Sequence, residues 1–189
     1  RYGEMQWVSK ITQALDENRF VLYCQPIAPL AEEDGDKFYC ELLIRMLDDD
    51  GQLVPPMAFL PAAERYNLIC SLDRWVVSAA CEIVRDYRHL FETQASVIAI
   101  NLSGQSLGDA GFLDFVIEQM AQAKVSPALF CFEVTETAAI THLVSAKRFI
   151  DVLRRKGCRF ALDDFGSGLS SFAYLKNLPV DCLKIDGHF

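Results

Sequence analysis

With 189 residues, 51% of them hydrophobic, the chain is long enough for one sizeable core and too short to indicate two domains. Its formal net charge of −8 argues against a general electrostatic grip on a nucleic acid polymer or an anionic membrane, so a phosphate-bearing ligand would need local cations. No apolar run approaches the ~20 residues that span a bilayer, and no signal-peptide pattern opens the chain.

The seven cysteines indicate the redox compartment. Their number is odd, no two show C-x-x-C spacing, and most lie within apolar runs. This usage is typical of buried, reduced thiols rather than of disulfides or a zinc site. It predicts a cytoplasmic location, although other domains of a parent protein could anchor it to a membrane.

The first segment predicts a helix followed by two antiparallel strands. Apolar residues recur at helical spacing over residues 4–17, and the apolar run 20–27 predicts a strand. Gln25 is polar within that run, as a solvent-facing side chain on an edge strand would be. Residues 31–37 are acidic and predict an exposed loop, short enough for a strand over 38–45 to run antiparallel to the first.

In this second strand Glu41 lies among apolar residues, and Arg45 follows on the same face. A buried glutamate is costly unless it is paired or bound to a metal. An exposed Glu41–Arg45 ion pair explains the pattern as well as a metal ligand does. The acidic stretch 48–51 lacks the later ligands and closing glutamate of a calcium loop, so it predicts a turn.

From the second strand onward, helical and extended patterns alternate, which predicts parallel βα units. Helices are expected over residues 55–66, 72–90, 109–123, 140–156 and 169–176, and strands over 97–103, 129–136, 159–164 and 180–186. Asn101 lies where a strand gives way to Ser-Gly, so an Asx turn or a helix cap would also explain it.

Residues 160–168 form the stretch on which the rest of the interpretation depends. A short apolar run ends in Asp163 and Asp164, and a glycine-rich turn follows. Successive side chains of a strand point to opposite faces, so the strand must end or twist at this pair. Two close carboxylates raise each other's pKa, and a divalent cation between them removes that cost. An isolated Asp-Asp pair is equally explained by an acidic turn that caps a helix.

Polar groups recur at the C-terminal ends of five predicted strands. Each residue can be explained by itself, but those separate explanations do not account for five occurrences at the same end of a strand. These groups are Glu41, Asn101, Glu133, Asp163 with Asp164, and Lys184. Parallel βα units bring the carboxyl ends of their strands to one face of a barrel. An oxygen-rich set without His or Cys suits Mg²⁺ or Mn²⁺ rather than zinc. A two-metal carboxylate site of this kind favours in-line hydrolysis of a phosphodiester.

Five motifs occur in order along nearly the whole chain. They are Glu41-Leu42-Leu43-Ile44-Arg45, Ile100-Asn101-Leu102-Ser103, Phe132-Glu133-Val134-Thr135-Glu136, Asp163-Asp164-Phe165-Gly166-Ser167-Gly168 and Leu183-Lys184-Ile185-Asp186. This ordered set resembles the motifs of EAL-domain proteins, and residues 23–27 resemble that family's first strand. The resemblance implies a modified TIM barrel with an antiparallel first strand. It also implies hydrolysis of cyclic di-GMP to the linear dinucleotide pGpG with two Mg²⁺ or Mn²⁺ ions.

The resemblance also implies a role for each matching residue. Ligands of the first metal are Glu41, Asn101, Glu133 and Asp163, and ligands of the second are Asp163, which bridges, and Asp164. Lys184 resembles the lysine that orients the attacking water and stabilises developing charge. Substrate contacts fall on Gln25, Leu43, Arg45 and Asp186. Glu136 resembles the residue that anchors the loop after the aspartate pair.

Two features depart from the family pattern. Leu42 replaces the name-giving alanine at a small apolar site, while the functional Glu41 is kept. The sequence also stops after the sixth strand, so we expect an EAL domain over residues 1–189, with a linker helix over about 1–19, that lacks its last two βα units. In the family those units carry a further metal-ligand glutamate and a substrate-binding glutamine. Residues 1–25 resemble the linker that follows a diguanylate-cyclase-like or sensory domain, so a larger parent protein is expected.

Other functions remain open at this stage. A catalytically inactive cyclic di-GMP receptor is the main alternative, and degenerate receptors usually lack one or more metal ligands. Every ligand position that this sequence reaches is filled, which favours the enzyme. An enolase-type barrel enzyme is a more distant alternative, because it does not account for the ordered motifs. Oligomeric state is also open, a homodimer included.

Overall fold

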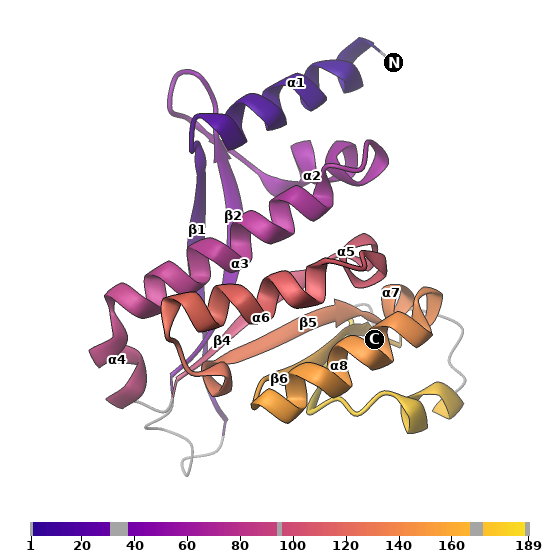
Figure 1. The fold of residues 1–189 in the computed structure, drawn as a ribbon. Helices are drawn as coiled ribbons and strands as arrows, with labels where there is room; N and C mark the ends of the chain where they lie inside the picture. The colour runs from indigo at the N-terminus through magenta and orange to yellow at the C-terminus, as the bar shows by residue number, and fades with distance from the viewer. Residues whose placement is uncertain (1, 31–37, 94–95, 167–171, 188–189) are drawn as a thin grey trace.

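The computed structural model describes residues 2–30, 38–93, 96–166 and 172–187. One sheet runs through these segments, with the main strands in the order β1-β2-β4-β5-β6-β7 (Figure 1). The strands are β1 (Phe20–Ile27), β2 (Tyr39–Leu47), β3 (Leu53–Val54), β4 (Val97–Leu102), β5 (Phe130–Thr135), β6 (Arg159–Phe165) and β7 (Cys182–Ile185). The first strand is antiparallel to β2, whereas β2, β4, β5, β6 and β7 are mutually parallel.

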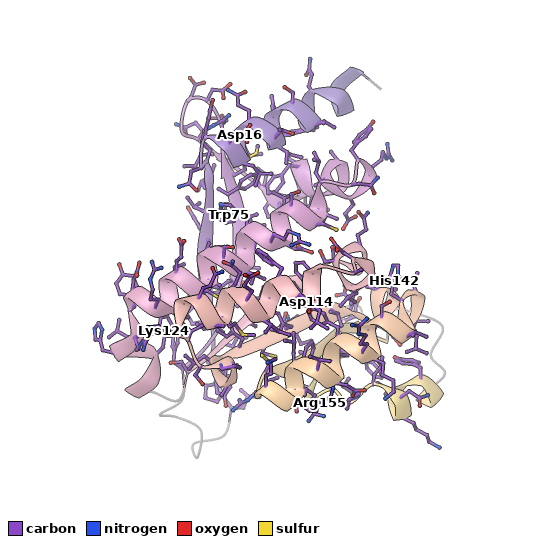
Figure 2. All side chains as sticks on the ribbon, in the orientation of Figure 1. Asp16, Trp75, Asp114, Lys124, His142 and Arg155 are labelled. Carbon is purple, nitrogen blue, oxygen red and sulfur yellow. The ribbon has the colours of Figure 1, made fainter. Side chains whose placement is uncertain are left out.

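Helices connect the parallel strands and cover the outer face of the sheet. They are α1 (Tyr2–Asp16), α2 (Pro56–Arg65), α3 (Ile69–Asp86), α4 (Arg88–Thr93), α5 (Gly104–Gly108), α6 (Phe112–Ala123), α7 (Glu136–Thr141) and α8 (Leu143–Lys156), with short 3-10 helices η2 (Pro127–Leu129) and η3 (Phe172–Asn177). Polar side chains such as Asp114 and Arg155 lie on the outward faces of these helices (Figure 2). This arrangement confirms the predicted modified barrel with an antiparallel first strand, with six main strands present.

The main core lies between the sheet and helices α3, α6 and α8. Phe132 of β5 and Phe160 of β6 are buried beside Phe149 of α8, whose ring also stacks on Phe112 of α6 with the centroids 5.9 Å apart. A second buried cluster joins α1, β1 and α2 around Ile11, and it includes the phenylalanine that begins β1. Burial of these large apolar side chains is the main force that fixes the strands in register.

The opposite, inner face of the sheet changes character along the strands. At their N-terminal ends it is apolar and buried, with Val97, Ala99, Cys131 and Ala161 in one cluster. At their C-terminal ends the same alternation of side chains brings polar residues to this face. Thus β5 buries Cys131 and then presents Glu133 two residues later. The inner face is therefore apolar at the N-terminal ends of the strands and polar at their C-terminal ends, which we call the rim.

Several sequence expectations need correction. The predicted helix over 72–90 is two helices, α3 and α4, because the chain turns at Tyr87. Another short helix, α7, begins directly at Glu136 and is separated from α8 by His142 (Figure 2), so the expected helix over 140–156 is also divided. The two-residue strand β3 was not predicted.

Other expectations are confirmed. The acidic stretch 48–51 forms a turn, in which the Asp48 carboxylate accepts the backbone N–H groups of Asp50 and Gln52. Gly157 ends α8 with a φ of 109°, the left-handed conformation that favours glycine. The predicted loop over 31–37 and the first part of the helix expected over 169–176 lie outside the described residues. Within the described segments, no helix is both long and apolar enough to cross a membrane.

Candidate active site

The Asp163–Asp164 pair lies on an irregularity of the sheet. Leu162 pairs with Leu183 and Phe165 with Ile185, so β6 carries one residue more than β7 between these two pairs. An extra residue of this kind is a β-bulge, which re-aims side chains and is common beside active sites. The strand therefore continues through the two acids to Phe165 and bends, rather than ending before them.

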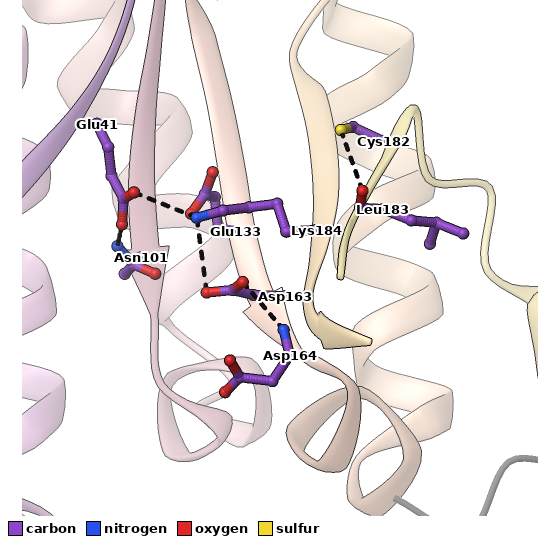
Figure 3. Close-up of polar contacts among 8 residues, drawn as sticks. All are labelled: Glu41, Asn101, Glu133, Asp163, Asp164, Cys182, Leu183 and Lys184. Carbon is purple, nitrogen blue, oxygen red and sulfur yellow. Dashed lines mark hydrogen bonds and ion pairs between the residues drawn. The ribbon is translucent and has the colours of Figure 1, made fainter. Parts of the chain in front are cut away.

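Backbone conformation supports this bulge. Asp164 has a φ of 52°, and its N–H donates to Asp163 Oδ1 at 2.9 Å. A left-handed conformation is uncommon for residues other than glycine, although aspartate tolerates it better than most. The turn places the two carboxylates at the C-terminal end of β6, where Figure 3 shows Asp164 beside Asp163.

Three carboxylates from three strands converge on the ammonium group of Lys184 (Figure 3). Its Nζ lies 2.5 Å from Glu133 Oε2, 3.2 Å from Glu41 Oε2 and 3.6 Å from Asp163 Oδ2. Asn101 joins the cluster by donating from Nδ2 to Glu41 Oε1 at 2.7 Å. The structure thus brings together five of the predicted site residues, which are separated by up to 143 positions in sequence.

Burial and charge together perturb this cluster. Only 3% of the Glu133 side chain is exposed. Burial raises the pKa of Glu133, and the hydrogen bond and charge of Lys184 offset this only in part. Burial alone would lower the pKa of Lys184, but the hydrogen bond to Glu133 and the nearby carboxylates raise it above its ordinary value. The lysine is therefore a fixed positive charge among an excess of acids.

The donor set fits a hard divalent cation in its chemistry. It consists of carboxylate and amide oxygens, the ligands that Mg²⁺ and Mn²⁺ prefer. In their present positions, no three His, Cys, Asp or Glu side chains of the described segments are grouped closely enough to hold a metal ion. The ammonium of Lys184 stands among these carboxylates instead. The residues are thus suitable for cations but are held apart around an internal counter-charge.

The predicted substrate contacts lie on the same face of the β1–β2 pair as Glu41. Gln25 is directly opposite Glu41 in the strand register, and Leu43 and Arg45 follow Glu41 at intervals of two. The Arg45 guanidinium lies 5.3 Å from the ring centroid of Tyr23 and donates to the backbone carbonyl of Ile44. Glu41 pairs with Lys184 rather than with Arg45, so the ion-pair alternative is wrong for this strand.

A pocket of about 540 Å³ opens beside the cluster. Its lining includes Leu43, Arg45 and Asn101, together with Glu64 and Ser103. Arg45 thus lines the same pocket as Asn101, which is the member of the Lys184 cluster that the pocket reaches. A cavity of this size can hold part of a small-molecule ligand.

The remaining predicted residues lie at the edge of the site. Glu136 is buried, and its Oε2 accepts the backbone N–H of Gly166 at 2.9 Å, which fits the loop-anchoring role that the resemblance implies. Asp186 directly follows β7, and its backbone N–H donates to the carbonyl of Phe165.

Sequence reasoning missed one further buried acid, Asp73. Asp73 of α3 is 6% exposed, and its Oδ2 accepts from the Ser103 N–H at 2.9 Å and the Ser106 hydroxyl at 2.7 Å. It thereby holds Ser103, the N-cap of α5, two residues after Asn101. A charged residue on the apolar face of a helix was the available signal, but the surrounding periodicity predicted only core positions.

Comparison with known proteins identifies the family. A family model for the EAL domain matches residues 8–189. The chain belongs to the EAL domain family. Its mixed fold, its ordered motifs and its carboxylate cluster all agree with that assignment.

Curated relatives carry the same domain within much longer chains. The cyclic di-GMP phosphodiesterase PdeB of Shewanella oneidensis is 38% identical over 184 residues, which are 97% of this chain and 21% of the relative. PdeF of Escherichia coli, also named a cyclic di-GMP phosphodiesterase, is 37% identical over 182 residues, or 96% of this chain and 24% of the relative. The EAL chain thus spans under a quarter of the length of these two proteins.

Solved structures share its architecture. The FimX EAL domain of Pseudomonas aeruginosa, bound to c-di-GMP, matches with a TM-score of 0.85 and 32% identity over 96% of this chain and 72% of that one. A PaMucR phosphodiesterase in complex with c-di-GMP matches with a TM-score of 0.84 and 33% identity, with the same coverage. These neighbours support a barrel-like EAL fold for the open sheet seen here.

Proposed function

We propose that this EAL domain hydrolyses cyclic di-GMP to pGpG. The observation that carries the proposal is the convergence of Glu41, Glu133 and Asp163 on Lys184 at the C-terminal rim of the sheet. Relatives named cyclic di-GMP phosphodiesterases and neighbours that bind c-di-GMP support the choice of substrate. Every metal-ligand position that the chain reaches is filled, which favours an enzyme over an inactive receptor.

Two divalent cations fit the donor set. Glu41, Asn101, Glu133 and Asp163 would hold the first, and Asp163 with Asp164 would hold the second. When bound, such ions lower the pKa of a water molecule and stabilise charge on the attacking and leaving oxygens of a phosphodiester. The bulge in β6 presents both aspartates from one strand, so Asp163 would serve both ions and Asp164 the second.

Lys184 has two proposed roles, one without bound cations and one with them. Without cations, its ammonium offsets part of the charge of the three carboxylates that surround it. When bound cations neutralise these carboxylates instead, Nζ of Lys184 can donate to the attacking water or to a phosphate oxygen. In the cation-free arrangement the hydrogen bond to Glu133 and the nearby carboxylates raise the pKa of Lys184, so the side chain is an ammonium donor there.

Arg45 and the adjacent pocket are the proposed binding elements. A guanidinium fork matches the geometry of phosphate oxygens, and the acidic chain needs such a local cation to attract an anionic substrate. Arg45 and Leu43 line the pocket of about 540 Å³ that reaches Asn101. Gln25, opposite Glu41, and Asp186, after β7, are proposed to complete the contacts.

The decisive experiment follows pGpG formation by chromatography with the natural full-length protein. We expect conversion of cyclic di-GMP to pGpG with Mg²⁺ or Mn²⁺, and none after chelation. A folded full-length protein that binds cyclic di-GMP but yields no pGpG would overturn the enzyme in favour of a receptor.

A further inference from the structure

The two carboxylate oxygens of Glu136 accept hydrogen bonds from the two ends of the connection between β6 and β7. Glu136 is 1% exposed at the start of α7, and its Oε2 accepts the N–H of Gly166 at the end of the β6 turn. Its Oε1 accepts the hydroxyl of Tyr174, which lies in η3 before β7. One buried carboxylate therefore joins the turn that leaves β6 to the helix that leads into β7.

The buried carboxylate of Glu136 needs hydrogen-bond donors for both of its oxygens. A buried carboxylate loses its hydration, and an unpaired oxygen there would be costly. The hydroxyl of Tyr174 supplies the donor for Oε1, while its ring packs against the main core. Burial and the hydrogen bond to Glu136 raise the pKa of Tyr174, so its hydroxyl remains a donor at neutral pH.

The turn that Glu136 holds contains the second aspartate. Gly166 has a φ of 93°, and Asp164, two residues earlier, has a φ of 52°. A non-glycine residue in the left-handed region persists when surrounding contacts enforce it. The hydrogen bond from Gly166 to Glu136 is one such contact, and Tyr174 orients the carboxylate that accepts it.

We propose that Tyr174 is a positioning residue that sets the place of Asp164 by orienting Glu136. This inference rests on the proposed two-metal hydrolysis, since Asp164 is a proposed ligand of the second ion only. Loss of the hydroxyl leaves Glu136 free to rotate and loosens its hold on Gly166. Groups hydrogen-bonded directly to a metal ligand typically change metal affinity by about 10–100-fold, and Tyr174, which acts through Glu136, is expected at the lower end of that range.

The test is Tyr174→Phe, which removes the hydroxyl and keeps the ring. Mn²⁺ binding is measured by electron paramagnetic resonance without substrate, in the natural full-length protein. We expect about tenfold weaker binding of the second Mn²⁺, with the first unchanged. Turnover should fall at limiting Mn²⁺ and recover at high Mn²⁺, while the KM for cyclic di-GMP stays the same. Tyr87→Phe, at an exposed tyrosine after α3, is the matched control.

Glu136→Gln shows whether Tyr174 acts through Glu136. A double variant that combines Tyr174→Phe with Glu136→Gln should bind the second Mn²⁺ no more weakly than Glu136→Gln alone. If the two residues acted independently, their effects on affinity would multiply. Multiplying effects, unchanged binding in Tyr174→Phe, equal weakening of both ions, or a wild-type protein that binds one ion at most would each overturn the inference. Wild-type protein that binds two ions without forming pGpG would overturn the proposed function alone.

Discussion

Asp73 and the cluster around Lys184 are two buried acidic regions with opposite arrangements. Asp73 is a single carboxylate whose hydrogen bonds come from neutral groups, the N–H of Ser103 and the hydroxyl of Ser106. Around Lys184, three carboxylates share one ammonium. Neutral donors satisfy the oxygen of Asp73, although burial still raises its pKa, whereas the three acids around Lys184 leave an excess of negative charge.

This difference indicates which region the fold uses for stability and which it reserves for chemistry. A buried acid that accepts hydrogen bonds from neighbouring residues orders the chain around it, as Asp73 does at the start of α5. Crowded acids raise the energy of the folded state unless cations join them. Such local conflicts are expected at functional sites, where stability is exchanged for activity.

The largest effect is expected from the crowded region. Glu41→Gln keeps the shape of the side chain but removes one charge from the cluster. Turnover of cyclic di-GMP should fall by about a hundredfold or more, as for loss of a group that stabilises a transition state. The measurement is steady-state pGpG formation with Mn²⁺. Glu118→Gln, at an exposed glutamate of α6, is the matched control and should retain full turnover. Equal activities would remove Glu41 from the chemistry.

A substitution at Asp73 should change the stability of the fold. Asp73→Ala leaves the Ser103 N–H and the Ser106 hydroxyl without their acceptor, which should lower the free energy of unfolding by about 1–3 kcal/mol. Chemical denaturation measures the change. Asp109→Ala, at a half-buried aspartate that pairs with Arg74, should cost less because that pair is more exposed. A larger loss from Asp109→Ala would contradict the comparison.

The smallest effect concerns the internal counter-charge. Lys184→Met removes the ammonium that competes with cations for the three carboxylates. Mn²⁺ should then bind about tenfold more tightly, equivalent to roughly 1.4 kcal/mol, even though turnover is lost. Calorimetry without substrate measures the affinity. Lys147→Met, at the exposed lysine that pairs with Asp151, should leave it unchanged. Weaker Mn²⁺ binding in Lys184→Met would show that the lysine supports the site rather than competing for it.

Sequence patterns predicted the rim of the site because strand alternation is local. Glu41, Asn101 and Glu133 each follow an apolar run, and parallel βα units bring such residues to one edge. The family resemblance added their individual roles, which remain proposals. What alternation cannot predict is how the residues meet across the sheet, such as the contact of Lys184 with Glu41.

Other features depend on tertiary context. The bulge at Asp163–Asp164 exists only because β6 pairs with β7 on both sides of it. Helix periodicity continues across Tyr87 and His142, so the breaks at these residues were not visible in the sequence. Tyr174 likewise has no local signal, because its partner Glu136 is 38 residues away.

The pairing of β1 with β2 also limits which changes in length the domain can accept. Gln25 faces Glu41 because the register matches Cys24 with Leu42 on the other face of the sheet. Deleting one residue within β1 would exchange the two faces, and either Cys24 or Pro26 would then stand opposite Glu41. Homologous chains that retain the site should therefore vary in length between strands and not within this one.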